Sequence, residues 1–174
     1  FNRSDAVPAV PSPDAIAAAA ARADWRLARV ALTPPSVLLP VEGMKLDFGG
    51  IAKGYAVDLV WDALRERGVT NALIDLGGNL RCLGEAAPGR GGWRTGIRDP
   101  FGGAVPIATF LLKPGQAVAT SGNYERFVEI GGIRYAHIMD ARTGRPVTGT
   151  AATTVIAPTA ELADVLSTTL FVLG

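Results

Sequence analysis

A carboxylate, two glycines and a lysine follow one another within seven residues of the chain. Asp47 precedes Gly49 and Gly50, and Lys53 stands where a helical pattern begins. Because glycine has no Cβ, backbone N–H groups at such a turn can approach a bound group closely. The first turn of a helix adds unpaired N–H donors and a partial positive charge. With the lysine, this combination suits a pyrophosphate; the alternative is an ordinary strand-to-helix turn with a surface lysine.

Near the C-terminus, a carboxylate and a hydroxyl share one face of an expected helix. Asp164 and Thr168 are four residues apart, and Glu161 lies one turn earlier. Carboxylate and hydroxyl oxygens can hold a hard cation such as Mg²⁺. The rest of this helix is mostly apolar, so a charged Asp164 near the core needs a partner. The alternative is a hydrogen bond along the helix face or a capping pair.

His137 is the only histidine of the chain, and it precedes a polar turn. Imidazole titrates near neutral pH, which makes it the best general base available here. Asp140 either orients this ring or caps the turn. The alternative for a lone histidine is a structural role.

Two small-residue loops are further candidates for contact with a ligand. Gly77 and Gly78 follow a short apolar strand, and Ser121 and Gly122 precede Asn123. The first pair is also typical of a type I′-like turn, and the second of a hairpin turn. No G-x-S-x-G elbow surrounds Ser121, which argues against a Ser-His-Asp hydrolase.

Composition excludes several classes of protein. The 174 residues carry a formal net charge of +1, with 19% charged and 48% hydrophobic residues, as in a globular domain. No basic field or basic run is present that would hold nucleic acid or an anionic membrane. No apolar run reaches the roughly 18 residues of a transmembrane helix. One cysteine excludes an internal disulfide framework. Since the chain begins with Phe1, we expect a fragment or a processed form, with any targeting segment outside it.

The pattern along the chain predicts an α+β fold. Helices are expected at residues 15–23, from 52 to a stop at Gly68, and at 159–173. Strands, mainly antiparallel and linked by hairpins, are expected at residues 37–39, 72–76, 93–98, 105–112, 116–120, 124–130, 133–139 and 153–157. This order does not alternate as a doubly wound sheet would, and the glycines at 49, 50 and 54 lack the G-x-G-x-x-G order of a Rossmann dehydrogenase.

Taken in order, these motifs resemble the ApbE family of FAD:protein FMN transferases. The matching stretches are residues 46–58, 75–80, 93–100, 117–126, 137–144 and 160–174. The resemblance implies one ApbE-like flavin transferase domain over residues 1–174, lacking an upstream region and a short segment after the last helix. It implies a Mg²⁺-dependent transfer of FMN from FAD to a threonine or serine hydroxyl of an acceptor protein, with release of AMP.

The resemblance also implies roles for individual residues. Asp47, Lys53 and His137 would contact FAD, and His137 would take the proton of the incoming hydroxyl. The backbone carbonyl of Gly50 and the side chains of Asp164 and Thr168 would bind the metal, with Glu161 nearby. The loops at Gly77, Gly78, Ser121 and Gly122 would line the flavin. The sequence departs from the family pattern at Asn123, Ala136 and Ala141, and none of these positions is an expected metal ligand or the base.

The implied setting is the bacterial periplasm or the outer face of the cytoplasmic membrane, where the acceptor would be a flavoprotein subunit of a redox complex. Two other activities fit the same residues. One is a pyrophosphatase that splits FAD into FMN and AMP, and the other is a non-catalytic flavin-binding module.

Overall fold

The structure of the chain, a computed structural model, describes residues 9–124 and 127–174. These residues form two compact units. The first unit contains residues 9–47 and 127–148, and the second contains residues 48–124 and 149–174. The expectation of one domain over residues 1–174 stays a prediction.

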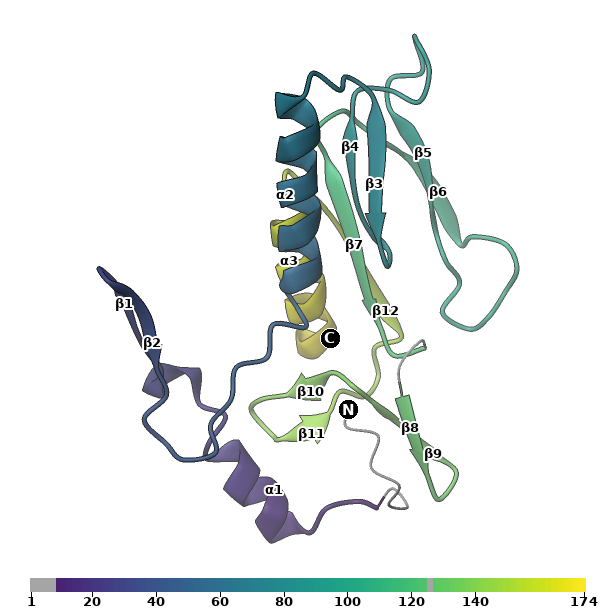
Figure 1. Ribbon diagram of the computed structural model, residues 1–174. Helices are drawn as coiled ribbons and strands as arrows, with labels where there is room; N and C mark the ends of the chain where they lie inside the picture. The colour runs from purple at the N-terminus through teal and green to yellow at the C-terminus, as the bar shows by residue number, and fades with distance from the viewer. Residues whose placement is uncertain (1–8, 125–126) are drawn as a thin grey trace. The chain divides into compact units, whose positions relative to one another are not determined.

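The second unit is built on a four-stranded antiparallel sheet in the order β12-β7-β4-β3 (Figure 1). The strands are β3 (Ala72–Leu76), β4 (Asn79–Leu83), β7 (Ala117–Gly122) and β12 (Ala152–Ala157). Helices α2 (Ala52–Glu66) and α3 (Ala160–Leu173) pack on one face of the sheet. A separate ribbon of β5 (Trp93–Ile97) and β6 (Ala108–Leu112) packs on the other face. The α+β expectation is therefore confirmed.

Strand β7 separates the two sides of this unit, because successive residues of a strand point to opposite faces. Ala117 packs in one buried cluster with Val57 of α2 and Ala160 of α3. Val118, the next residue, packs on the opposite side with Leu112 of β6. Small alanines on the helix side let the helices approach the sheet closely.

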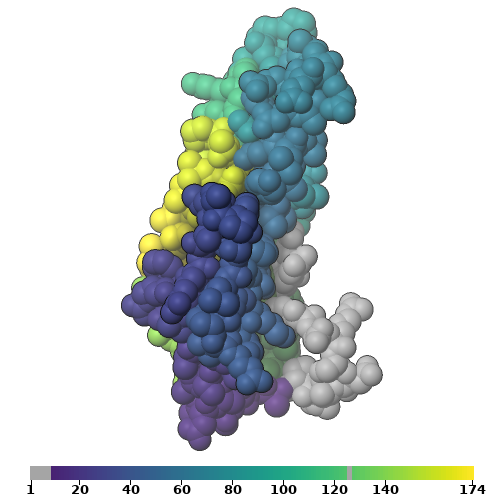
Figure 2. Space-filling model, turned by 60° about the vertical axis from the view of Figure 1, so that its left-hand side comes forward, coloured from purple at the N-terminus to yellow at the C-terminus, as the bar shows by residue number. Residues whose placement is uncertain are grey.

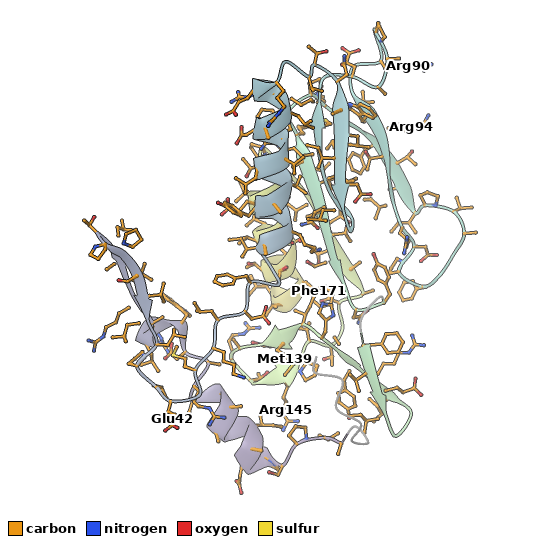
Figure 3. The ribbon with its side chains drawn as sticks, in the orientation of Figure 1. Glu42, Arg90, Arg94, Met139, Arg145 and Phe171 are labelled. Carbon is orange, nitrogen blue, oxygen red and sulfur yellow. The ribbon has the colours of Figure 1, made fainter. Side chains whose placement is uncertain are left out.

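The helix layer has one buried side and one apolar outer side. On α3, Phe171 is fully buried (labelled in Figure 3). Leu162, Leu166 and Leu170 repeat every four residues on the outer side and remain 43%, 37% and 46% exposed. Figure 2 shows α3, in yellow, at the surface beside the blue α2.

The first unit consists of short elements. They are α1 (Pro13–Ala20), the 3₁₀ turn η1 (Trp25–Leu27), and the antiparallel pairs β1 (Arg29–Leu32) with β2 (Pro35–Leu38), β8 (Phe127–Ile130) with β9 (Ile133–Ala136), and β10 (Met139–Asp140) with β11 (Arg145–Pro146). The Ser12 hydroxyl accepts the N–H of Ala15 at 3.2 Å and caps α1, which begins two residues before the expected helix 15–23.

Most expected elements are present, and several differ in extent. The strand expected at residues 133–139 is wrong beyond Ala136, where a bend at His137 separates β9 from β10. The helix expected to reach residue 23 ends at Ala20, and the strand expected from residue 105 begins at Ala108. Three strands, β1, β4 and β11, have no counterpart among the expected strands. Residues 125 and 126 of the expected strand 124–130 lie outside the described part. In the part of the chain that the structure describes, no helix is both long and apolar enough to span a bilayer.

Candidate functional site

Lys53 lies in the first turn of α2, and its ammonium is held by the sheet. Its Nζ donates a hydrogen bond to Oδ1 of Asn79, the first residue of β4, at 3.0 Å. Asn79 is completely buried, and its Nδ2 has no hydrogen-bond partner among the described residues. Lysine only donates, so this contact fixes which atom of the amide faces Lys53. A positive charge is thereby placed beside the turn that joins β3 to β4.

Asp164 is anchored at the beginning of α2. It is only 2% exposed, and its Oδ2 accepts the backbone N–H of Gly54 at 3.0 Å. This is the partner that a buried carboxylate requires, and the positive end of the α2 dipole stabilises its charge. The bond depends on close contact between the helices. A Cβ on Gly54 would lie 2.6 Å from the carbonyl carbon of Ala160 and 2.7 Å from the Cα of Glu161.

Three hydroxyls beside Asp164 form a chain of hydrogen bonds. The Oγ of Ser167 donates to the backbone carbonyl of Asp164 at 3.0 Å. The Oγ of Ser121 lies 2.9 Å from the Oγ of Ser167 and 3.0 Å from the Oγ1 of Thr168. Each hydroxyl has one proton, so Ser121 donates to Ser167, and Thr168 donates to Ser121. This order leaves the lone pairs of the Thr168 oxygen for another partner.

The backbone of Gly50 lies against the same threonine. A Cβ placed on Gly50 would lie 3.3 Å from both the Oγ1 and the Cγ2 of Thr168. The structure therefore brings together Gly50, Asp164 and Thr168, the residues expected to bind the metal.

This group of residues fits a hard cation by the chemistry of its donors. A backbone carbonyl, a carboxylate and a hydroxyl are all oxygen ligands. Mg²⁺ is usually bound by one or two carboxylates together with waters and substrate phosphates, not by a cage of protein side chains. The described residues contain no group of three or more His, Cys, Asp or Glu side chains that could hold a metal ion.

A pocket of about 570 Å³ lies on the opposite side of the sheet, between the sheet and the β5–β6 ribbon. Its volume is within the range of small-molecule sites. The lining residues are Asp75, Gly77, Gly78, Leu80, Thr95, Gly96, Ile97, Arg98, Phe110, Val118, Thr120, Tyr124 and Thr154. The aromatic rings of Phe110 and Tyr124 and the bare backbone of the glycines are suited to a planar ring system.

Gly77 and Gly78 form a two-residue hairpin loop between β3 and β4. Both have positive φ, at 59° and 87°, as the expected type I′-like turn requires. The N–H of Gly78 also donates a hydrogen bond to the Oδ1 of Asp75 at 2.9 Å. The turn and the ligand-lining interpretation are compatible, because both glycines line the pocket.

The loop after β7 is divided between the two sides of the sheet. Thr120 and Tyr124 line the pocket, while the hydroxyl of Ser121 faces α3. A Cβ on Gly122 would lie 2.8 Å from the Cδ1 of Tyr124, so the ring packs directly over this glycine. Contacts of Ser121 and Gly122 with flavin stay predictions.

Asp47 and His137 belong to the first unit. His137 is half-buried at the bend between β9 and β10. Asp140 caps the following turn: its Oδ1 accepts the N–H of Arg142 at 2.8 Å, and its carbonyl accepts the N–H of Gly144 at 2.8 Å. Side-chain and backbone hydrogen bonds from Arg142 hold the pKa of the Asp140 carboxyl below its usual value. Capping is thus the role of Asp140 that these contacts support.

Sequence reasoning missed the ion pair that orients α3. The Oδ1 of Asp58, on α2, lies 2.7 Å from a guanidinium nitrogen of Arg81, on β4. The same carboxylate accepts the backbone N–H groups of Ala160 and Glu161 at 2.8 and 2.9 Å. Asp58 therefore caps the N-terminus of the helix that carries two of the residues expected to bind the metal. One signal was available: Asp58 is four residues after Gly54, on the apolar face of α2.

Known proteins share this fold and these motifs. A family profile described as the ApbE family matches residues 1–174, and the chain belongs to this family. It is 41% identical to the FAD:protein FMN transferase of Treponema pallidum over 179 residues, which cover 95% of this chain and 49% of that protein. For an FAD:protein FMN transferase of Klebsiella pneumoniae the identity is 42% over 158 residues, covering 84% and 48% of the two chains.

Solved structures agree with this assignment. The ApbE protein of Thermotoga maritima superposes with a TM-score of 0.88 at 37% identity, over 95% of this chain and 52% of that one. The flavinyl transferase ApbE of Pseudomonas stutzeri gives a TM-score of 0.78 at 37% identity, over 95% and 50%. The chain spans about half the length of these relatives. The resemblance inferred from the motifs is confirmed at the level of the family.

Proposed function

We propose that this chain takes part in the Mg²⁺-dependent transfer of FMN from FAD to a threonine or serine hydroxyl of an acceptor protein, with release of AMP. The observation that carries the proposal is the cluster of oxygen donors of Gly50, Asp164 and Thr168 in the same unit as the ammonium of Lys53. The names of the relatives support the same reaction.

The positive charges act on the pyrophosphate. Lys53, held by Asn79, neutralises charge that develops on the phosphate oxygens as the P–O–P bridge breaks. Asp164 and Thr168, with the Gly50 carbonyl, would hold Mg²⁺. When bound, the ion supplies Lewis-acid stabilisation of the same oxygens. The bond from Gly54 to Asp164 keeps this carboxylate in place without a second side chain.

The transfer itself replaces the phosphoanhydride bond of FAD with a phosphate ester on the acceptor. The oxygen of the acceptor hydroxyl attacks the phosphorus on the FMN side, the bond to the bridging oxygen breaks, and that oxygen leaves with AMP. His137 takes the proton of the attacking hydroxyl. A positioned base of this kind contributes roughly 10²–10⁴-fold to the rate.

The pocket of about 570 Å³ is the proposed site of the flavin ring. It is lined by Gly77, Gly78 and Tyr124, from two of the loops expected to contact flavin. Asp47 completes the proposed set of FAD contacts. We place the reaction in the periplasm or at the outer face of the cytoplasmic membrane, on a flavoprotein subunit of a bacterial redox complex, as the family resemblance implies.

The test measures AMP release from FAD, with and without Mg²⁺, in the presence of a threonine-bearing acceptor peptide. We expect AMP and peptide-bound flavin only with Mg²⁺. His137→Ala should keep FAD binding and lose transfer, and Asp164→Asn should lose the response to Mg²⁺. Asp62→Asn is the matched control, because Asp62 is an exposed carboxylate of α2 whose ion pair, among the described residues, is with exposed Arg65.

The products distinguish the remaining activities. AMP with free FMN would show the pyrophosphatase, and bound FAD without AMP would show a binding module. Transfer at the normal rate by His137→Ala would refute the role given to that residue.

A further inference from the structure

A second pocket, of about 550 Å³, lies in the second unit and shares one lining residue with the proposed flavin pocket. It is formed by the β4–β5 connection and the β5–β6 ribbon. The lining residues are Ala86, Ala87, Arg90, Gly92, Arg94, Thr109, Phe110 and Leu111. Arg94 lies within the stretch 93–100, and none of the candidate site residues expected from the sequence is in this list.

Two arginines give this pocket its charge. Arg90 comes from the connection and Arg94 from β5 (both labelled in Figure 3). Neither guanidinium forms an ion pair or hydrogen bond with another described residue, and no acidic residue is among those that line the pocket. The Thr109 hydroxyl, also at the lining, is likewise not engaged within the described part of the chain.

Six other arginines are engaged within the protein, whereas the guanidinium groups of Arg22, Arg29 and Arg145 are not engaged among the described residues but lie outside both pockets. Ion pairs, a hydrogen bond to a helix carbonyl or stacking on an aromatic ring engage Arg26, Arg65, Arg67, Arg81, Arg134 and Arg142. A guanidinium presents planar N–H donors that match carboxylate or phosphate oxygens. Two unengaged arginines on one pocket therefore form a receptor for an anion.

Hydrogen bonds within the β4–β5 connection hold the loop that carries Arg90 in its conformation. The Oε2 of Glu85 accepts the N–H of Gly91 at 3.0 Å, so this nearby carboxylate is committed to the backbone. The N–H of Ala86 donates to the carbonyl of Gly92 at 3.2 Å. At Gly92, with φ of 150°, a Cβ would lie 3.0 Å from the carbonyl carbon of Leu112, so the loop is fitted closely to β6. The pocket is preformed, which lowers the entropic cost of binding.

The rest of the lining is apolar. Phe110 is half-buried, Leu111 is 45% exposed, and Ala86 and Ala87 complete this part of the lining. Apolar side chains beside two cations select a ligand that has both characters.

We propose that this pocket binds an organic anion, a carboxylate or phosphate group carried on an apolar frame. Two sources provide this chemistry: a free small molecule, or an acidic side chain next to an apolar residue in a protein segment. The site is separate from the proposed transfer reaction and does not depend on it.

The experiment follows backbone amide signals of the ¹⁵N-labelled 174-residue chain while a probe is added. Phenyl phosphate represents the free small molecule, and a short peptide containing Glu-Phe represents the protein segment. We expect saturable shifts at Gly91, Gly92 and Thr109, which lie at or beside the pocket. The Gln-Phe peptide should not saturate, and inorganic phosphate, which lacks the apolar frame, should bind about tenfold more weakly than phenyl phosphate.

Matched variants distinguish binding at this pocket from non-specific electrostatic attraction of an anion to the protein. The double variant Arg90→Gln/Arg94→Gln should weaken phenyl phosphate or peptide binding by about tenfold or more. The control Arg29→Gln/Lys113→Gln removes the same charge from exposed residues outside the lining and should change affinity by less than about twofold. The proposal is overturned if neither probe saturates, if the Arg90/Arg94 variant binds as the unmodified chain does, or if the control weakens binding equally. Saturation by one probe alone identifies the source.

Discussion

Replacement of Gly54 by alanine tests whether the close approach of α2 and α3 holds Asp164 in place. The new Cβ would lie 2.6 Å from the carbonyl carbon of Ala160, about 0.8 Å inside ordinary van der Waals contact. The obstacle is backbone, which no change of side-chain rotamer can relieve. Overpacking of this kind costs about 3 kcal/mol. Alanine gains about 1 kcal/mol in helix propensity, and weakening of the bond to Asp164 loses about 1 kcal/mol.

We therefore expect Gly54→Ala to lower the free energy of unfolding by about 3 kcal/mol. For a chain of this length the corresponding decrease in Tm is roughly 6–12 °C. The assay is urea unfolding followed by far-UV circular dichroism, with thermal unfolding as a second measure. The control is Tyr55→Ala, at the adjacent residue of α2, which is 53% exposed and should have a much smaller effect.

The sign of the effect is the critical result. Helix propensity alone predicts that alanine stabilises α2 by about 1 kcal/mol. A Gly54→Ala chain as stable as the original, or more stable, would show that the helices can separate at no cost and would refute the steric argument.

Three further perturbations test contacts within one unit or the other. Asp58→Asn should destabilise the chain by about 3–5 kcal/mol, because it leaves the poorly exposed Arg81 without its carboxylate; denaturant unfolding measures the loss, and a loss below about 1 kcal/mol would contradict it. Cys82 is fully buried, and burial raises the pKa of its thiol above 9.0, so its contribution to stability is present below that pH and is lost as pH rises through the raised value. A thiol reagent at pH 8 should label it only after unfolding, and rapid labelling of the native chain would oppose this reasoning. Hydrogen bonds from Arg142 lower the pKa of Asp140, so the stabilisation they give is present above the ordinary carboxyl pKa and disappears as pH falls through the lowered one. An NMR titration of the Asp140 carboxyl should give a midpoint below 3.8 that moves back toward 3.8 in Arg142→Gln, and an unchanged midpoint would contradict the assigned cause.

The elements that were predictable are those whose local signals agree. Thr159 accepts the N–H of Leu162 and begins α3 where the sequence pattern placed it. The paired glycines between β3 and β4 take the positive φ values that their turn type requires.

β4 was missed because it is short and directly follows a turn signal. Its polar residues, Asn79 and Arg81, alternate with apolar ones as in a strand with a solvent-exposed face, yet both are buried in the structure. Only the tertiary structure supplies their partners, Lys53 and Asp58 of α2. The local sequence therefore contains no signal that β4 is a central strand.

In the candidate site, too, some features follow from local sequence spacing and others only from tertiary contacts. The spacing of Asp164 and Thr168 predicted a shared helix face, and the structure places both beside the start of α2. Spacing cannot predict that Ser121 would donate a hydrogen bond to Ser167 and accept one from Thr168, because these bonds join β7 to α3 across 46 and 47 residues. The bend at His137 was missed because residues compatible with a strand stand on both sides of it, and the local sequence carries no turn residue at that point.

The separate pairing of the β5–β6 ribbon bears on how a ligand would enter the proposed flavin pocket. Within the described residues, this ribbon forms its own two-stranded sheet and shares no ladder with β12-β7-β4-β3. Apolar contacts, such as that of Leu112 with Val118, hold the two layers together. Hydrogen bonds from Trp93 Nε1 to the carbonyl of Leu83 and from Cys82 Sγ to the carbonyl of Lys113 also join them, where β5 begins and where β6 ends. The pocket is lined by Thr95, Gly96 and Ile97, further along β5. Its width therefore depends on the packing of side chains between the layers, because no ladder of backbone hydrogen bonds fixes the ribbon to the sheet there.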